Sequence, residues 1–234
     1  MKKLLFVLIC VTCSTVFIAC QKNQDLASTS SSEFGSKAVG STTMETEMQS
    51  VVSECGQFRT QTQGGWGARP AGNNPGTYLH AHFASAFPLG LTIGCDRSGF
   101  SVYYSSADAV TAFLPAGGGP SALSGNANDP KAKSIKNVLL GQVTALALSV
   151  GFDFADPDFG PAQENLGNMV IASGAFAGKN INEFLFLANT ALGGCATGYS
   201  FSELNQTATL INENFDDGTM DRGFLTCPTS RFDR

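Results

Sequence analysis

The chain has 234 residues, of which 14 are basic and 19 acidic, so its net charge is −5. This acidic balance argues against nucleic acid as a partner, because phosphate binding needs a basic surface. After Val51, where aromatic residues, Leu and Gly appear together, about 180 residues remain, enough for one domain with a substantial core.

The N-terminus is typical of an export signal. Lys2 and Lys3 precede an uncharged, mostly apolar run that ends at Cys20. The run is short for a membrane span and is interrupted by Thr12, Ser14 and Thr15. We therefore expect a cleaved signal peptide rather than a transmembrane helix.

The end of this run, Phe17-Ile18-Ala19-Cys20, resembles the lipobox of bacterial lipoproteins, although the family usually has Leu where Phe17 stands. The resemblance implies that residues 1–19 are removed and that Cys20 is acylated. The protein would then be attached to the lipid bilayer through acylated Cys20, at the outer membrane or cell surface. An ordinary cleaved signal with an incidental cysteine remains the alternative.

Residues 20–52 are rich in Ser and Thr and contain few large apolar side chains. Such a segment buries too little surface to offset the entropy of ordering it, so we expect a flexible tether. Loss of Lys2 and Lys3 with the signal peptide would change the net charge to −5 − 2 = −7. The tether is expected to lead to a single globular domain over residues 53–228, followed by a tail of residues 229–234.

Four cysteines fall within the expected domain. An even number in an exported chain predicts two disulfides. Sequence allows three connectivities, and we favour one that ties the ends of the domain together: Cys55–Cys227 and Cys95–Cys195. The wide spacing does not resemble a zinc site, which brings its ligands in close pairs.

The first half of the domain predicts two helices and two short strands. Residues 56–76 are rich in Gly, Gln and Asn and predict a loop with at most one short strand. A helix capped by Thr77 is expected to run to Phe87, with strands over 91–93 and 100–104. Ser105 and Asp108 form a possible capping box for a helix that ends at Leu114.

The second half predicts three further helices. The first runs from Ser134 to about Val150, on a continuous apolar face, and a strand is expected over 169–171. Residues 180–192, apolar on almost every side, are expected to be the most buried helix. A capping box at Ser200 and Glu203 opens the last helix. The predicted fold class is α+β, mostly helical with a few short strands, as an irregular helical bundle on a small sheet.

Gly94-Cys95 and Gly194-Cys195 are each followed by a Gly-aromatic-Ser sequence and a predicted capped helix. This echo indicates either an old duplication or a chance match in a chain rich in Gly and Ser. A duplication would make Cys95 and Cys195 equivalent positions, which supports pairing them.

The two histidines of the chain, His80 and His82, lie on the helix predicted to start at Thr77. Residues two apart on a helix point about 200° away from each other, so the pair is not expected to grip one metal ion. The chain has no Gly-x-Ser-x-Gly elbow of the kind that presents a serine nucleophile. We expect no metal and no cofactor, and we assign no catalytic residue.

Two acidic loops and one tryptophan are the remaining candidates for binding. Asp153, Asp156 and Asp158 offer hard oxygen ligands for Ca²⁺, as do Asp216, Asp217 and Asp221, but neither loop has EF-hand spacing. We favour solvated caps and turns for both. Trp66 follows two glycines and is a possible ligand contact, although a tryptophan of this kind more often covers the edge of the core.

Residues 62–67, 87–95, 113–118 and 137–142 resemble stretches of an uncharacterised domain found in secreted and cell-surface proteins of Bacteroidota. The resemblance implies a location and no activity. We expect a non-enzymatic, membrane-tethered module that binds an unknown envelope protein or glycan. The alternative is an envelope hydrolase acting on glycan or peptide, which a polar cleft with a histidine beside a carboxylate would favour.

Overall fold

The structure is a computed structural model that describes residues 55–95 and 99–228, all of which fall in one compact unit. The expected signal peptide (1–19), the lipidation residue Cys20, the whole of the expected tether (20–52) and the tail (229–234) lie outside the described residues. They stay predictions.

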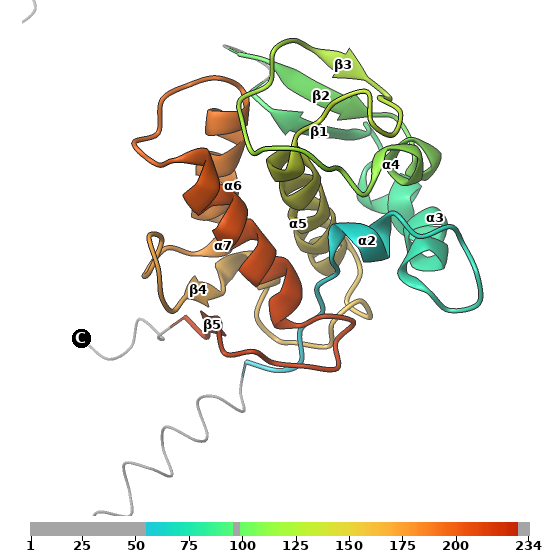
Figure 1. The fold of residues 1–234 in the computed structure, drawn as a ribbon. Helices are drawn as coiled ribbons and strands as arrows, with labels where there is room; N and C mark the ends of the chain where they lie inside the picture. Colours follow the sequence, from blue (N-terminus) through green and yellow to red (C-terminus); the bar gives the residue numbers. More distant parts are fainter. Residues whose placement is uncertain (1–54, 96–98, 229–234) are drawn as a thin grey trace, which may run out of the picture. The chain divides into compact units, whose positions relative to one another are not determined.

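The described part of the chain contains six α-helices and a small mixed sheet, which confirms the predicted α+β fold class. The helices and one 3-10 turn, η1, are, in chain order, α2 (Gln63–Trp66), α3 (Pro75–Ala86), α4 (Ala107–Phe113), α5 (Val138–Ala155), η1 (Leu166–Asn168), α6 (Ile181–Leu192) and α7 (Phe201–Asn214). Figure 1 shows α5 running between α6 and α7 on one side and α3 and α4 on the other.

The main sheet has the strand order β1-β2-β3. β1 (Leu91–Gly94) pairs antiparallel with β2 (Ser101–Tyr104), and β2 pairs parallel with β3 (Ala127–Asn128). A separate antiparallel pair joins β4 (Val170–Ile171) to β5 (Leu225–Thr226). Strands β1, β2 and β4 were predicted. The two-residue strands β3 and β5 were not, because so short a strand leaves no alternation to detect.

The central helix is α5, and not α6 as the composition of residues 180–192 suggested. Phe184 of α6 is fully buried, but Phe186 is 71% exposed. α5 packs against α3, α6 and α7. It is the one described helix long and apolar enough to cross a membrane, and most of it is buried inside the domain.

Helix starts agree with the sequence where a full capping box is present and shift where it is not. Asn180 with Glu183, and Ser200 with Glu203, form reciprocal capping boxes at α6 and α7. α3 begins earlier than predicted, because Asn74 accepts from the Thr77 amide. Two other helices also differ from the prediction. α4 is capped by Ser106 instead of Ser105. α5 was expected from Ser134 to about Val150, but it is capped by Asn137 and runs from Val138 to Ala155.

One predicted disulfide is present, and the expectation of two is corrected to one. Cys55 is bonded to Cys227, which joins the ends of the described domain. Among the described residues no other cysteine pair lies at disulfide distance. The segments that carry Cys95 and Cys195 lie side by side: the Phe100 amide donates to the Gly193 carbonyl, and a Cβ on Gly193 would lie 2.3 Å from Cys95 Cβ.

Candidate functional site

Helix α3 carries both histidines and directs them to opposite sides. His80 Nε2 lies 3.0 Å from Thr111 Oγ1 on α4, and its Nδ1 lies 3.8 Å from Asp108 Oδ1. His82 Nδ1 lies 3.4 Å from Asp156 Oδ2, at the end of α5. The helical geometry predicted from the sequence is confirmed, and two side chains so placed cannot bind one ion.

A shallow depression of about 300 Å³ lies between α3 and α4, on the His80 side. Its size is at the lower end of the range for small-molecule sites. Part of the lining is polar and part apolar, from both helices and the turn after α3. The residues that matter for binding are His80, Phe87, Pro88, Ser105, Ser106 and Asp108.

The local sequence explains why the chain leaves a depression here. α3 stops at Ala86, just before Pro88, which lacks the amide that a continuing helix needs. The chain returns through β1 and β2 to Ser106, the N-cap of α4. Beside it, Ser105 donates from its hydroxyl to Asp129 Oδ2 at 2.7 Å, and the hydrogen bonds from Ser105 lower the pKa of the Asp129 carboxyl.

Several polar groups in the depression retain hydrogen-bonding capacity. Asp108 has a side chain that is 92% exposed, and the 3.8 Å to His80 is too long for a hydrogen bond. The Ser106 hydroxyl accepts from the Ala109 amide and keeps its own hydrogen to donate. These groups face an apolar wall, so the depression can bind a small group that has both a polar and an apolar side.

On the other side of α3, the end of α5 meets a second polar cluster. The Tyr78 hydroxyl donates to Asp156 Oδ2 at 2.5 Å, and the Tyr78 and His82 rings stack with centroids 4.1 Å apart. The Tyr78 bond is the main reason why the pKa of Asp156 is lowered. Burial, then the bond to Asp156, raises the pKa of Tyr78. The guanidinium of Arg59 lies over the Tyr78 ring at 5.5 Å.

The three aspartates proposed for calcium do not converge on one point. Asp153 accepts from the Leu166 amide, while Asp156 accepts from Tyr78 and from the Asp158 amide. Burial raises the pKa of Asp153 to about 6. Within residues 55–95 and 99–228, no three His, Cys, Asp or Glu side chains are grouped to hold a metal ion.

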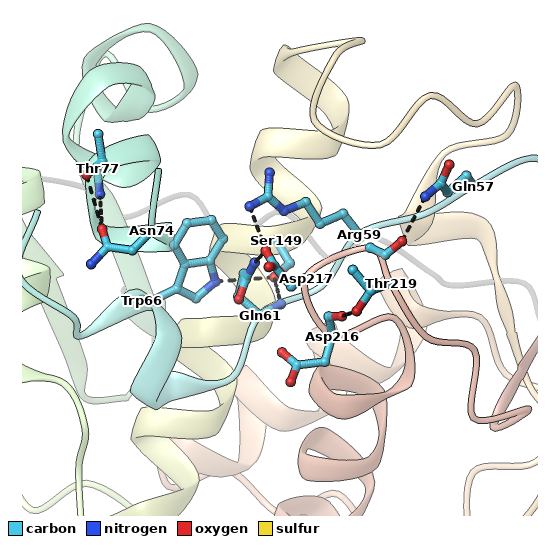
Figure 2. A network of polar contacts seen from close by, with 11 residues as sticks. Gln57, Arg59, Gln61, Trp66, Asn74, Thr77, Ser149, Asp216, Asp217 and Thr219 are labelled. Atoms are coloured by element: carbon cyan, nitrogen blue, oxygen red, sulfur yellow. Dashed lines mark hydrogen bonds and ion pairs between the residues drawn. The ribbon is translucent and has the colours of Figure 1, made fainter. Parts of the chain in front are cut away.

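The aspartates of the other acidic loop, Asp216, Asp217 and Asp221, also do not gather around one point. Asp217 Oδ1 accepts from Arg59 at 2.9 Å and from Gln61 at 2.8 Å. Asp221 accepts from Asn214 and from the amide of Gly223. Figure 2 shows Arg59 and Gln61 directed toward Asp217, with the Asp216 carboxylate apart from them. This loop therefore fastens the N-terminal segment of the domain to the end of α7.

Trp66 is not a surface contact for a ligand; of the two interpretations of its Gly-rich surroundings, the one that places it against the core is correct. Its side chain is 0% exposed and packs against Phe152 and Phe159. The indole N–H donates to Ser149 Oγ at 3.3 Å (Figure 2). Thr62 caps the short helix α2 that turns this side chain inward, so Trp66 closes the core.

Sequence reasoning identified the histidines but not their neighbours. Asp108 was considered only as part of a helix cap, and Thr111 and Arg59 were not singled out. The spacing of Tyr78 and His82, four residues apart on one helix face, is a local signal that was available. The contacts of Asp108 and Asp156 with α3 join distant segments and have no local signal.

Comparisons with protein-family models, with curated proteins and with solved structures found no match to this chain.

Proposed function

We propose that this protein is a lipid-anchored envelope or cell-surface protein whose domain binds a ligand without turning it over. The observation that carries the proposal is the depression between α3 and α4. It combines exposed, incompletely bonded polar groups with an apolar wall, at a size suited to one small group or one unit of a polymer.

The location is supported by the lipobox-like sequence that ends at Cys20 and by the Ser- and Thr-rich segment after it. The Cys55–Cys227 disulfide agrees with this location, because such bonds persist outside the reducing cytosol. A tether of this kind keeps a binding domain near the membrane, where it can hold an envelope protein or glycan.

A hydrolase is the second candidate, favoured by the placement of His80 between a hydroxyl and a carboxylate. The arrangement is that of a catalytic triad, with Thr111 in the place of the nucleophile, His80 in that of the base and Asp108 in that of the acid that orients the base. However, Asp108 is largely exposed and makes no hydrogen bond to His80, so it does not fix the imidazole. Thr111 lies inside α4, where backbone amides are used by the helix. We therefore favour binding.

The test uses the full chain purified from membranes in detergent and defined glycan and peptide fragments of the producing cell's envelope. Ala84 lines the depression and is exposed, so Ala84→Trp fills the depression without disturbing the core. Ala81→Trp, at an exposed position of α3 outside the lining, is the matched control.

We expect a fragment that binds the wild type and Ala81→Trp proteins and binds Ala84→Trp at least tenfold more weakly. Equal binding by both variants would show that the depression is not the site. Fragment cleavage by the wild type that disappears in His80→Ala would instead establish the hydrolase.

A further inference from the structure

We infer that the group bound in the depression between α3 and α4 is a neutral sugar ring. The inference rests on the proposed function and specifies the ligand class of that site. It follows from three properties of the lining: its charge, its donors and acceptors, and its apolar wall.

The charge of the lining disfavours an anion. No lysine or arginine is among the residues that line the depression, and Asp108 places a carboxylate there. An anionic group would meet no lysine or arginine there, and the screened carboxylate of Asp108 would add only weak repulsion. A cationic ligand would gain little, because the Asp108 carboxylate is 92% exposed and its attraction is screened by water.

The donors and acceptors suit hydroxyl groups. His80 Nδ1 and Asp108 Oδ1 are 3.8 Å apart, so each is near the other without forming a hydrogen bond. When Thr111 donates to Nε2 of a neutral His80, the hydrogen of the ring is on Nδ1. A ligand hydroxyl beside this pair can accept from His80 and donate to Asp108.

The Ser106 hydroxyl offers a further donor in the same lining. The lining thus offers donors at His80 and Ser106 and an acceptor at Asp108. A ligand that both donates and accepts hydrogen bonds at neighbouring positions suits them better than a ligand that only donates or only accepts. Adjacent hydroxyls on a sugar ring have this property.

The apolar wall suits the C–H face of such a ring. Phe87 and Pro88 both line the depression. The Phe87 ring contacts Phe83 and Phe152 with centroids 5.2 and 5.4 Å away, and it occupies the space that a side chain at Gly151 would need. Phe87 is therefore held in place before a ligand arrives, and little ordering entropy is lost on binding.

The two histidines of the sequence provide a built-in test. His80 lines the depression, whereas His82 lies on the other side of α3 against Tyr78 and Asp156. The full chain is labelled with ¹³C-histidine and the ring C–H signals are assigned with His80→Gln and His82→Gln. The probes are the methyl glycosides of glucose, galactose and mannose, with Nα-acetyl-lysine amide as the cationic comparison and succinate as the anionic one.

We expect at least one glycoside to shift the His80 signals saturably while the His82 signals stay unchanged. Asp108→Ala should weaken this binding at least tenfold. Because Asp108 is exposed, the variant should fold, and unchanged His82 signals will verify that it does.

The inference is overturned if no glycoside shifts His80, or if Asp108→Ala binds as tightly as the wild type. If Nα-acetyl-lysine amide or succinate shifts His80 and the glycosides do not, the ligand class is wrong but binding in the depression stands. The proposed function itself is tested separately: it fails if Ala84→Trp and Ala81→Trp bind the envelope fragments equally, or if the wild type cleaves a fragment that His80→Ala does not.

Discussion

Tyr78 and Asp156 are joined by a hydrogen bond of 2.5 Å that ties α3 to the end of α5. The same carboxylate oxygen lies 3.4 Å from His82 Nδ1, so it is close to two side chains on one face of α3. This contact sets the position of the helix that carries His80 on its other side.

Tyr78→Phe should lower the free energy of unfolding at pH 7 by about 1.5 kcal/mol, the value of one partly exposed hydrogen bond to a charged group. The pKa of Asp156 is lowered in the folded protein, chiefly by this bond. Its stabilisation is therefore present above the unfolded pKa, about 4, and is lost as the pH falls through the lowered folded value. The difference between the variant and the wild type should shrink in acid.

Urea unfolding at pH 7 and pH 3 measures both effects of Tyr78→Phe. Tyr103→Phe is the matched control, because no described residue forms a hydrogen bond with the Tyr103 hydroxyl. An equal loss of stability in the two variants would contradict the role given to the Tyr78–Asp156 bond.

Asp153→Asn should stabilise the protein at neutral pH. Burial raises the pKa of Asp153 to about 6, with a smaller contribution from Glu164. The folded state therefore binds a proton more tightly than the unfolded state, and the resulting stability is lost as the pH rises through about 6. Asn avoids the buried charge and retains an oxygen for the Leu166 amide.

We expect Asp153→Asn to gain roughly 1 kcal/mol at pH 7.5, allowing for its partial exposure, and nothing at pH 4. Thermal unfolding across this pH range provides the measurement, with the exposed neighbour Asp158 changed to Asn as the control. A gain that is the same at pH 4 and pH 7.5 would mean that the Asp153 charge is not its cause.

Ser149→Ala should be strongly destabilising. Ser149 Oγ accepts from the Trp66 indole N–H and from the backbone N–H of Gln61, and all three residues are buried. Removing the hydroxyl leaves two buried donors without an acceptor, at a cost of about 2–4 kcal/mol in total. Guanidinium unfolding followed by the fluorescence of Trp66, the one tryptophan of the chain, reports the change directly.

Ser202→Ala, at an exposed position of α7, should change stability by less than about 0.5 kcal/mol. If Ser149→Ala were as mild as this control, the hydrogen bonds to Ser149 would contribute little to holding α2 on α5.

Cys20→Ala should release the protein from membranes, because acyl chains on Cys20 would supply the attachment. The measurement is fractionation of cells followed by detection of the protein in the soluble and membrane fractions. Cys13→Ala, inside the segment expected to be removed, is the control and should leave the distribution unchanged. Continued membrane association of Cys20→Ala would refute the lipoprotein interpretation.

Local sequence predicted the helices well where local interactions define them. The reciprocal bonds at Asn180–Glu183 and Ser200–Glu203 involve residues three apart, so a sequence pattern contains the whole motif. The starts at Asn74 and Asn137 were missed because several polar residues near each start could have served as the cap. Beside Gly151, α5 packs against the ring of Phe87, which follows α3, and local sequence contains no sign of this contact.

The candidate site was predictable only in part, for the same reason. The opposed directions of His80 and His82 follow from helix geometry alone. Their partners do not, since Asp156 comes from a segment more than 70 residues away and Asp108 from across two strands. Burial of Trp66 likewise depends on Ser149, 83 residues further along the chain.

The bond between Cys55 and Cys227 also has a mechanical consequence. Cys227 lies 172 residues after Cys55 in sequence, but the disulfide joins the two directly. A force that pulls on the chain before Cys55 is therefore transmitted through the disulfide to Cys227. Tension is thereby divided between the first segment of the fold and β5, which lies beside β4. The domain cannot be peeled open from its N-terminal end alone, a property that would suit the membrane-anchored binding protein proposed above.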